Sequence, residues 1–126
     1  MNVPENLKYS KDHEWISIDG NVGTIGVTDY AQGELGDVVF VDVDSGLSEI
    51  KKGESFGTIE AVKTVSDMYA PCTGKVLEVN GKLSDAPESI NSDPYGEGWI
   101  IKVEINDMSE LSDLLDAEDY KELIGA

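Results

Sequence analysis

Lys63 is the residue whose type and setting in the sequence suggest chemistry most directly. It is the only lysine between Lys52 and Lys75, and small or β-branched residues surround it. Because β-branched residues favour strands, the sequence predicts two short strands joined by a tight turn, with Lys63 at its tip. A lysine amine on such a turn is a nucleophile that a long prosthetic group can acylate. From these residues alone, an ordinary exposed lysine is the simpler interpretation.

Other familiar chemical motifs are missing from the sequence. His13 is the only histidine and Cys72 the only cysteine, so a Cys-His nucleophilic pair would require the two to meet across the fold. Cys72 stands in a strand-like context, where a buried small apolar residue is expected rather than a nucleophile. There is no phosphate-binding loop, dinucleotide fingerprint, Gly-x-Ser-x-Gly motif or metal-binding histidine pair. We therefore expect no bound metal and no independent enzymatic activity.

Composition and charge restrict the class of partner. The chain has 126 residues, 40% of them hydrophobic, which suits one domain over residues 1–126 with a buried core. It has 26 acidic residues against nine lysines and no arginine, for a formal net charge of −17. Such a surface repels phosphate backbones and anionic lipids, so we expect neither nucleic acid nor membrane as a partner. The charge suits solubility alone, and it equally suits docking on basic patches of larger proteins.

The start of the sequence has the features of neither a secretory signal nor a transit peptide. No apolar run approaches the roughly 20 residues that a membrane helix needs. We therefore expect a cytoplasmic protein with Met1 as its native start.

Alternating apolar residues and turn formers predict a mainly β core over about residues 13–105. Residues 14–18 and 22–27 form a predicted hairpin around the turn at Asp19-Gly20-Asn21. Thr28 is a suitable N-cap for a short helical turn directly after that hairpin.

Two segments further along the chain look like copies of one β-unit. Residues 36–60 and 74–104 each begin with a glycine before an apolar strand. Each also contains a later run of glycine, glutamate, a spacer and an aromatic residue, namely Gly53-Glu54-Ser55-Phe56 and Gly96-Glu97-Gly98-Trp99. Self-similar halves are expected to pack about an approximate twofold axis as a small flattened barrel or sandwich. The connector, residues 61–73, would then present Lys63 at one end.

The C-terminal part of the chain predicts a long loop and two short helices. Residues 82–98 are rich in turn formers and too long for an ordinary hairpin loop, so they are expected either to serve a function or to cover a sheet end. Apolar residues then recur at helical spacing in two groups, Leu111, Leu114 and Leu115, and Tyr120, Leu123 and Ile124. With Asp107 and Asp116 as possible caps, we expect a pair of short helices over about residues 107–124, packed on the β core.

A series of short motifs runs through almost the whole chain in a fixed order. Before the lysine these are Tyr9, His13-Glu14-Trp15, Gly26-Val27-Thr28-Asp29-Tyr30-Ala31-Gln32 and Leu35-Gly36-Asp37-Val38-Val39-Phe40-Val41. Around and after it come Glu60-Ala61-Val62-Lys63-Thr64-Val65-Ser66-Asp67, Tyr69-Ala70-Pro71, Gly74, Val79-Asn80, Ile90-Asn91, Pro94-Tyr95-Gly96-Glu97-Gly98-Trp99 and the leucine-rich end. In this order and spacing the sequence resembles the glycine cleavage system H protein family.

The resemblance implies a lipoyl-domain-like fold of two small β-sheets with C-terminal helices, and lipoate attached covalently to Lys63 as an amide. The residues flanking the lysine are then candidates for recognition by the lipoylating enzyme, namely Glu60, Ala61, Val62, Thr64 and Asp67. In the family, the lipoyl arm accepts an aminomethyl group from glycine decarboxylase, the P-protein. An aminomethyltransferase, the T-protein, passes the one-carbon unit to tetrahydrofolate, and dihydrolipoyl dehydrogenase, the L-protein, reoxidises the arm.

The resemblance also implies how this chain would behave as a carrier. The carrier itself catalyses no turnover, and an acidic shuttle is expected to be a monomer. In the family, the loaded arm is described as folding into a surface cleft, and Glu14 and the residues around Leu35 belong to the matched segments. This chain has Ala61 and Thr64 where the family commonly has serine and alanine. Both residues are small, so we expect lipoylation to survive.

Three alternatives remain open at the level of sequence. A biotin carrier shares the fold and the hairpin lysine, but its family places methionines where this chain has Val62 and Thr64. An H-like protein would instead use its lipoyl arm as a donor to other lipoyl enzymes or in a redox role outside glycine cleavage. A purely structural interaction protein would make no use of Lys63.

Overall fold

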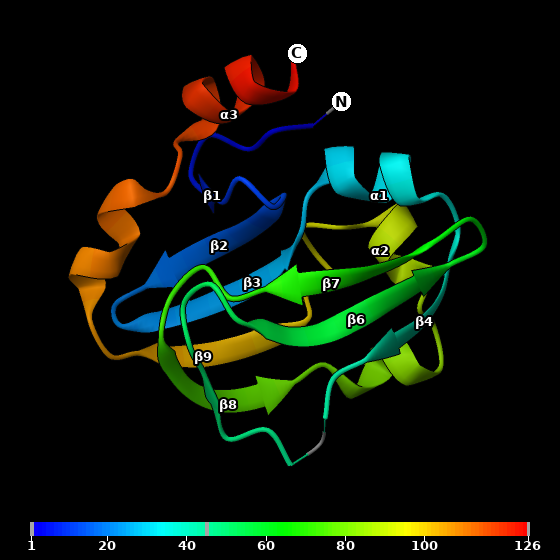
Figure 1. Cartoon of the computed structure of the whole chain (residues 1–126), viewed down its shortest axis with the longest axis horizontal. Helices are drawn as coiled ribbons and strands as arrows, with labels where there is room; N and C mark the ends of the chain where they lie inside the picture. The colour runs from blue at the N-terminus through cyan, green and yellow to red at the C-terminus, as the bar shows by residue number, and fades with distance from the viewer. Residues whose placement is uncertain (1, 45, 126) are drawn as a thin grey trace.

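The computed structural model describes residues 2–44 and 46–125, and it contains two antiparallel sheets with short helices around them (Figure 1). Met1, the expected native start, lies outside these residues. The six-stranded sheet has the order β1 (Lys8–Tyr9), β2 (Glu14–Asp19), β3 (Val22–Val27), β9 (Ile101–Ile105), β8 (Gly74–Val79) and β5 (Glu49–Ile50). The three-stranded sheet has the order β4 (Val38–Asp42), β6 (Ser55–Ala61) and β7 (Val65–Tyr69). The described strands do not close into a barrel, and the prediction of a mainly β fold with two small sheets is confirmed.

The main core lies between the two sheets. Ile16, Ile25 and Ile101 are register partners across β2, β3 and β9, so their side chains share one face of the larger sheet. They belong to one buried cluster with Ile59 and Met68 of the smaller sheet. Burying each such side chain contributes about 1.5–3 kcal/mol, which holds the sheets face to face.

The predicted N-terminal hairpin and helical turn are confirmed. The strands β2 and β3 pair along their whole length around a two-residue turn, in which Gly20 has the left-handed φ of 63° that glycine adopts freely. The helix α1 (Asp29–Leu35) begins after Thr28, whose side chain accepts a hydrogen bond from the Ala31 N–H at 3.1 Å.

The two predicted β-units each supply one antiparallel pair, but to different sheets. The strands β4 and β6 pair in the small sheet, and β8 and β9 pair in the large one. The strand predicted after Lys63 is confirmed as β7, which lies within the connector of residues 61–73 and completes the small sheet. In addition, β5 leaves the first unit and pairs with β8 of the second. Such pairing depends on where strand partners lie in space, which the sequence pattern does not specify.

The predicted pair of C-terminal helices is confirmed as a 3₁₀ helix, η2 (Met108–Asp113), and an α-helix, α3 (Ala117–Ile124). Asp107 caps the first through the Ser109 N–H, and Asp116 caps the second through the Asp119 N–H. The helix α3 lies beside the N-terminal segment (Figure 1), and together they form a second apolar cluster on the outer side of β2, made of Val3, Leu7, Tyr9, Trp15, Ala117 and Tyr120.

The predicted loop at residues 82–98 contains two short helices. They are η1 (Gly81–Ser84) and α2 (Ser89–Ser92), and α2 lies beside α1 (Figure 1). None of the described helices has both the length and the apolar character needed to cross a membrane.

Candidate functional site

Lys63 is exposed in the three-residue turn between β6 and β7. The turn is closed by a hydrogen bond from the Ala61 N–H to the Thr64 carbonyl at 2.8 Å. The flanking strands pair in regular register from Glu60 and Val65 to Gly57 and Met68, and the register shifts only beyond Gly57, so the part of the hairpin next to the turn is regular. No ion pair to Lys63 is found within residues 2–44 and 46–125. The amine is therefore exposed on an ordered turn and forms no ion pair with the described residues.

The chain between α1 and β4 supports the Lys63 turn from one side, as Figure 1 shows. The Val62 N–H donates to the Asp37 carbonyl at 3.0 Å. A Cβ placed on Gly36 would lie 3.8 Å from the Lys63 Cδ, so the aliphatic stem of the lysine passes the Gly36 backbone. Gly36 ends α1 with φ 80° and ψ −159°, a conformation that essentially only glycine adopts.

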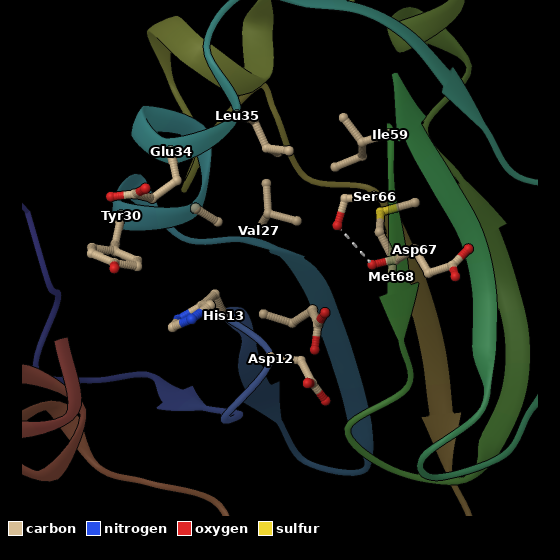
Figure 2. A pocket seen from close by; sticks show the side chains of 12 residues that line it. Asp12, His13, Val27, Tyr30, Glu34, Leu35, Ile59, Ser66, Asp67 and Met68 are labelled. Atoms are coloured by element: carbon tan, nitrogen blue, oxygen red, sulfur yellow. Dashed lines mark hydrogen bonds between the residues drawn. The ribbon is translucent and has the colours of Figure 1, made fainter. Parts of the chain in front are cut away.

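A surface cavity of about 320 Å³ opens between α1, the start of β2 and strand β7 (Figure 2). Its apolar lining comes from Val27, Leu35, Ile59 and Met68. Its polar lining comes from Asp12, His13, Glu14, Tyr30, Glu34, Ser66 and Asp67. Leu35 precedes Gly36, and Ser66 lies three residues beyond Lys63, so the cavity begins close to the lysine turn. It combines an apolar wall with several acidic side chains.

Glu14 is the buried acid of this cavity, with a residue exposure of only 2%. One carboxyl oxygen accepts from the Ser10 hydroxyl at 2.6 Å, and the other accepts from the Tyr69 N–H at 3.2 Å. Burial raises the pKa of Glu14 to about 8, whereas these two hydrogen bonds act in the opposite direction. This pKa favours the protonated carboxyl at neutral pH.

His13 lies at the edge of the same cavity and is held by the C-terminal helix. It has a left-handed φ of 70°, and its Nδ1 lies 2.9 Å from the Tyr120 hydroxyl. That hydroxyl also contacts the Thr28 hydroxyl at 2.7 Å, which joins α3 to the start of α1. Burial lowers the pKa of His13, so the ring tends to remain neutral. Cys72 lies outside the cavity, buried between β7 and β8, where burial raises the pKa of its thiol to about 11. It is the small buried residue that the sequence indicated.

The structure separates the five predicted flanking residues into two groups. Glu60, Val62, Thr64 and Asp67 are exposed around Lys63, and Asp67 also lines the cavity. Ala61 is instead buried in the main core. A recognition role for these residues stays a prediction, and for Ala61 it could only be indirect.

Sequence reasoning did not identify two features near the site, the buried carboxyl of Glu14 and the contacts of Asn91 with the loop before β4. The strand pattern contained a signal for the first, because Glu14 and Ile16 are two residues apart and share one face. Since Ile16 faces the core, Glu14 had to face it as well. Asn91 offered no such signal, because its contacts lie more than 50 residues away in the chain.

The fold and this site together define a class of protein. Within the described residues, Lys63 is the one lysine displayed on a hairpin turn of the small sheet, and no metal-binding cluster accompanies it. A site that presents an amine on a hairpin turn near a cavity with an apolar wall suits a carrier protein, which holds a group on a side chain for other proteins to act upon.

Comparison with known proteins identifies the family. The family model described as glycine cleavage H-protein matches residues 7–126. Glycine cleavage system H proteins of Staphylococcus carnosus and Staphylococcus haemolyticus are 55% and 56% identical over 125 residues, which cover 99% of this chain and 99% of each relative. A crystal structure of a glycine cleavage system H protein from Mycobacterium marinum matches with a TM-score of 0.89 at 38% identity, covering 98% of this chain and 100% of that one. The chain belongs to the glycine cleavage H-protein family.

Membership of this family gives the chain a lipoyl-carrier role in glycine cleavage. It also makes the chain a carrier subunit that interacts with the other glycine cleavage enzymes and is not itself a catalyst.

Proposed function

We propose that Lys63 carries lipoate as an amide and that this chain shuttles an aminomethyl group between three enzymes in the cytoplasm. Glycine decarboxylase would load the arm, an aminomethyltransferase would unload it to tetrahydrofolate, and dihydrolipoyl dehydrogenase would reoxidise it. The observation that carries the proposal is the exposed Lys63 amine on an ordered turn, in a chain whose family carries lipoate. The carrier would act as a monomer, because its strong negative charge disfavours contact between copies.

The residues near Lys63 fit a lipoyl group. The lysine stem already passes Gly36, and the next residue, Leu35, belongs to the cavity wall. The apolar side chains Val27, Ile59 and Met68 suit an aliphatic arm. When attached, lipoate supplies a disulfide that can be reduced, loaded with a one-carbon fragment and reoxidised.

Glu14 would bind an amine that enters this cavity. Its buried carboxyl already has two hydrogen-bond donors, and an ammonium at contact distance would stabilise its ionised form. Because burial raises the pKa of Glu14 to about 8, its carboxyl would be protonated near neutral pH. It would lose this proton when an ammonium pairs with it. The cavity would thus bind the amine and shield it from water, through an ion pair with Glu14 that forms only when the amine is present.

The exposed flanking residues Glu60, Val62, Thr64 and Asp67 would form the surface read by the lipoylating enzyme. Val62 is 72% exposed and directly precedes Lys63, so it is the most accessible apolar contact there. Ala61 would contribute through packing, because its methyl group is buried beneath the turn.

Intact and peptide mass spectrometry of the protein from its native host tests the attachment directly. We expect a lipoyl adduct on the peptide that contains Lys63 and on no other lysine peptide. A biotin adduct would overturn the proposal. An unmodified Lys63 in cells with active lipoylation would also overturn it and would favour a structural role.

Reconstitution with the three partner enzymes tests the shuttle itself. We expect glycine-dependent release of carbon dioxide and ammonia only when the lipoylated chain is present. A chain that is lipoylated but inactive in this assay would instead support the alternative of an H-like lipoyl donor or redox carrier.

A further inference from the structure

A side-chain amide from the 82–98 segment holds the loop that supports the lysine turn. Asn91 of α2 accepts a hydrogen bond from the Val38 N–H through Oδ1 at 2.8 Å. Its Nδ2 donates to the Gly36 carbonyl at 2.8 Å and to the Gln32 Oε1 at 3.0 Å. One half-buried amide thus binds the end of α1 and the start of β4 together.

The partners of Asn91 determine the orientation of its amide. A backbone N–H can only donate and a backbone carbonyl can only accept, so a flipped amide would lose both the Val38 and the Gly36 contacts. The two contacts lie on either side of Asp37 in the chain. Asn91 therefore fixes the backbone on both sides of this one residue.

Asp37 in turn makes the contact that docks the lysine turn. Its carbonyl accepts from the Val62 N–H at 3.0 Å, one residue before Lys63. On the other side, Gly36 lies against the stem of Lys63. One path from the Asn91 amide to the lysine therefore passes through Asp37 and Gly36.

We propose that Asn91 is a positioning residue for Lys63. It fixes the Asp37 carbonyl and the Gly36 backbone, and these set the direction in which the lysine side chain leaves the surface. Its importance for modification of Lys63 rests on the proposed function, whereas its effect on the turn does not. The 82–98 segment thus acts on the lysine site and does not only cover the end of a sheet.

Asn80 provides a matched control in the same part of the chain. Its Nδ2 donates to the carbonyls of Glu97 and Trp99 at 3.0 and 2.8 Å, and its Oδ1 accepts from the Lys82 N–H at 3.2 Å. It therefore makes the same number of hydrogen bonds as Asn91, also mainly to backbone groups. None of these three hydrogen bonds is made to the loop at residues 36–38.

Amide hydrogen exchange followed by NMR tests the positioning in the unmodified protein. In Asn91→Ala we expect exchange at the Val62 N–H, the docking bond, to accelerate on the order of tenfold. Exchange at the Ala61 N–H, which closes the turn, should change much less, because the hairpin stays formed. In Asn80→Ala the Val62 exchange should keep its wild-type rate relative to the core amides.

The result is decided by the contrast between these variants. Unchanged Val62 exchange in Asn91→Ala, or equal acceleration at Ala61 and Val62, would overturn the proposal. If Asn91→Ala fails to fold, Gln32→Ala replaces it, because this change removes only one of the three contacts of Asn91. Gln32→Ala should then accelerate Val62 exchange by a smaller factor than Asn91→Ala would, and an unchanged rate would overturn the proposal.

The rate of enzymatic lipoylation gives the functional readout. We expect kcat/KM for Lys63 modification to fall several-fold in Asn91→Ala and to stay at the wild-type value in Asn80→Ala. An equal fall in both variants would show a general effect of stability and overturn the functional part. A wild-type chain that accepts no lipoate would refute the proposed function, and the Val62 exchange would still decide the positioning.

Discussion

Glu14 lines the cavity from the large sheet, whereas Lys63 stands near it on a turn of the small sheet, and the two residues differ in almost every physical respect. Lys63 is exposed on a turn of the small sheet, with no ion pair among the described residues. Glu14 lies at the start of β2 in the large sheet, almost fully buried, with a hydrogen bond to each carboxyl oxygen. In the proposed function, the group that other proteins would reach stands outside the core, whereas the group that would hold a cargo is buried in it.

This difference predicts that the two positions respond to mutation in opposite ways. An exposed charge contributes little to folding, so Lys63 can change without loss of stability. A buried carboxyl carries a desolvation cost and depends on its donors, so Glu14 should influence stability strongly. Function and stability should therefore separate between the two residues.

The largest expected effect is loss of carrier activity in Lys63→Arg. A guanidinium is always protonated and cannot take the place of the amine, so attachment of lipoate and glycine-dependent turnover should be abolished. The free energy of unfolding should stay within about 0.5 kcal/mol of the wild-type value. Mass spectrometry, the reconstituted assay and urea unfolding measure these three quantities.

Lys75→Arg is the control for this substitution, because Lys75 is an exposed lysine on β8. It should retain both lipoate attachment and turnover. Residual lipoate on Lys63→Arg, or a marked loss of its stability, would contradict the contrast between the two positions.

Glu14→Gln should produce the largest change in stability, and the change should depend on pH. The pKa of Glu14 in the folded protein, about 8, lies above its ordinary value of 4.5, so the folded state binds more protons between these pH values. Stability from this group is therefore fully present below pH 4.5 and is lost as pH rises to about 8. At 1.36 kcal/mol per pKa unit the loss is on the order of 5 kcal/mol.

Urea unfolding of wild type and Glu14→Gln at a series of pH values isolates this contribution from the other acidic groups. The stability of the wild type relative to the variant should fall through that range and level off above it. A difference that does not change with pH would mean that Glu14 is ionised in the folded protein.

The features that sequence predicted well are local ones. The turn at Lys63 follows from β-branched residues on both sides, and the caps Thr28, Asp107 and Asp116 each bond to an N–H two or three residues away. All the information that such features require lies within a few residues. The chemical role of Lys63 came from the order of motifs along the chain and not from any one of them.

The features that sequence missed depend on contacts between distant segments. The strand β5 leaves the first predicted β-unit and pairs with β8 of the second, which the repeat did not indicate. The cavity combines α1, the start of β2 and β7, so no local pattern describes it. Asn91 reaches Val38 and Gly36 across more than 50 residues, and a single sequence carries no sign of that contact.

Gly36→Ala tests the support of the lysine turn and should have a moderate effect. The φ of 80° and ψ of −159° at Gly36 belong to a region that is essentially restricted to glycine, so alanine should cost about 1–3 kcal/mol. The added Cβ would meet Lys63 at an ordinary contact distance, so the cost comes from the backbone and not from a collision.

Gly33→Ala in the same helix is the matched control. A Cβ at Gly33 would meet no atom within 4 Å, and Gly33 has no left-handed φ. Because alanine is the better helix former, this change should stabilise the protein by about 0.5–1 kcal/mol. Urea unfolding should therefore give opposite signs for the two substitutions, and equal signs would contradict the role of Gly36.

The smallest expected effect is that of Ser10→Ala on the Glu14 end of the cavity. The Ser10 hydroxyl donates to the carboxyl at 2.6 Å and accepts from the Glu14 N–H at 3.1 Å. Its hydrogen bond favours the ionised carboxyl, so removing it should raise the pKa of Glu14 above 8 and cost about 1 kcal/mol of stability. An NMR titration of the Glu14 carboxyl carbon measures the pKa.

Ser66→Ala is the control, because Ser66 lines the same cavity but donates to the Asp67 carbonyl, so it should leave this pKa unchanged. An equal rise in both variants would mean that general polarity of the cavity, and not the Ser10 contact, sets the state of Glu14.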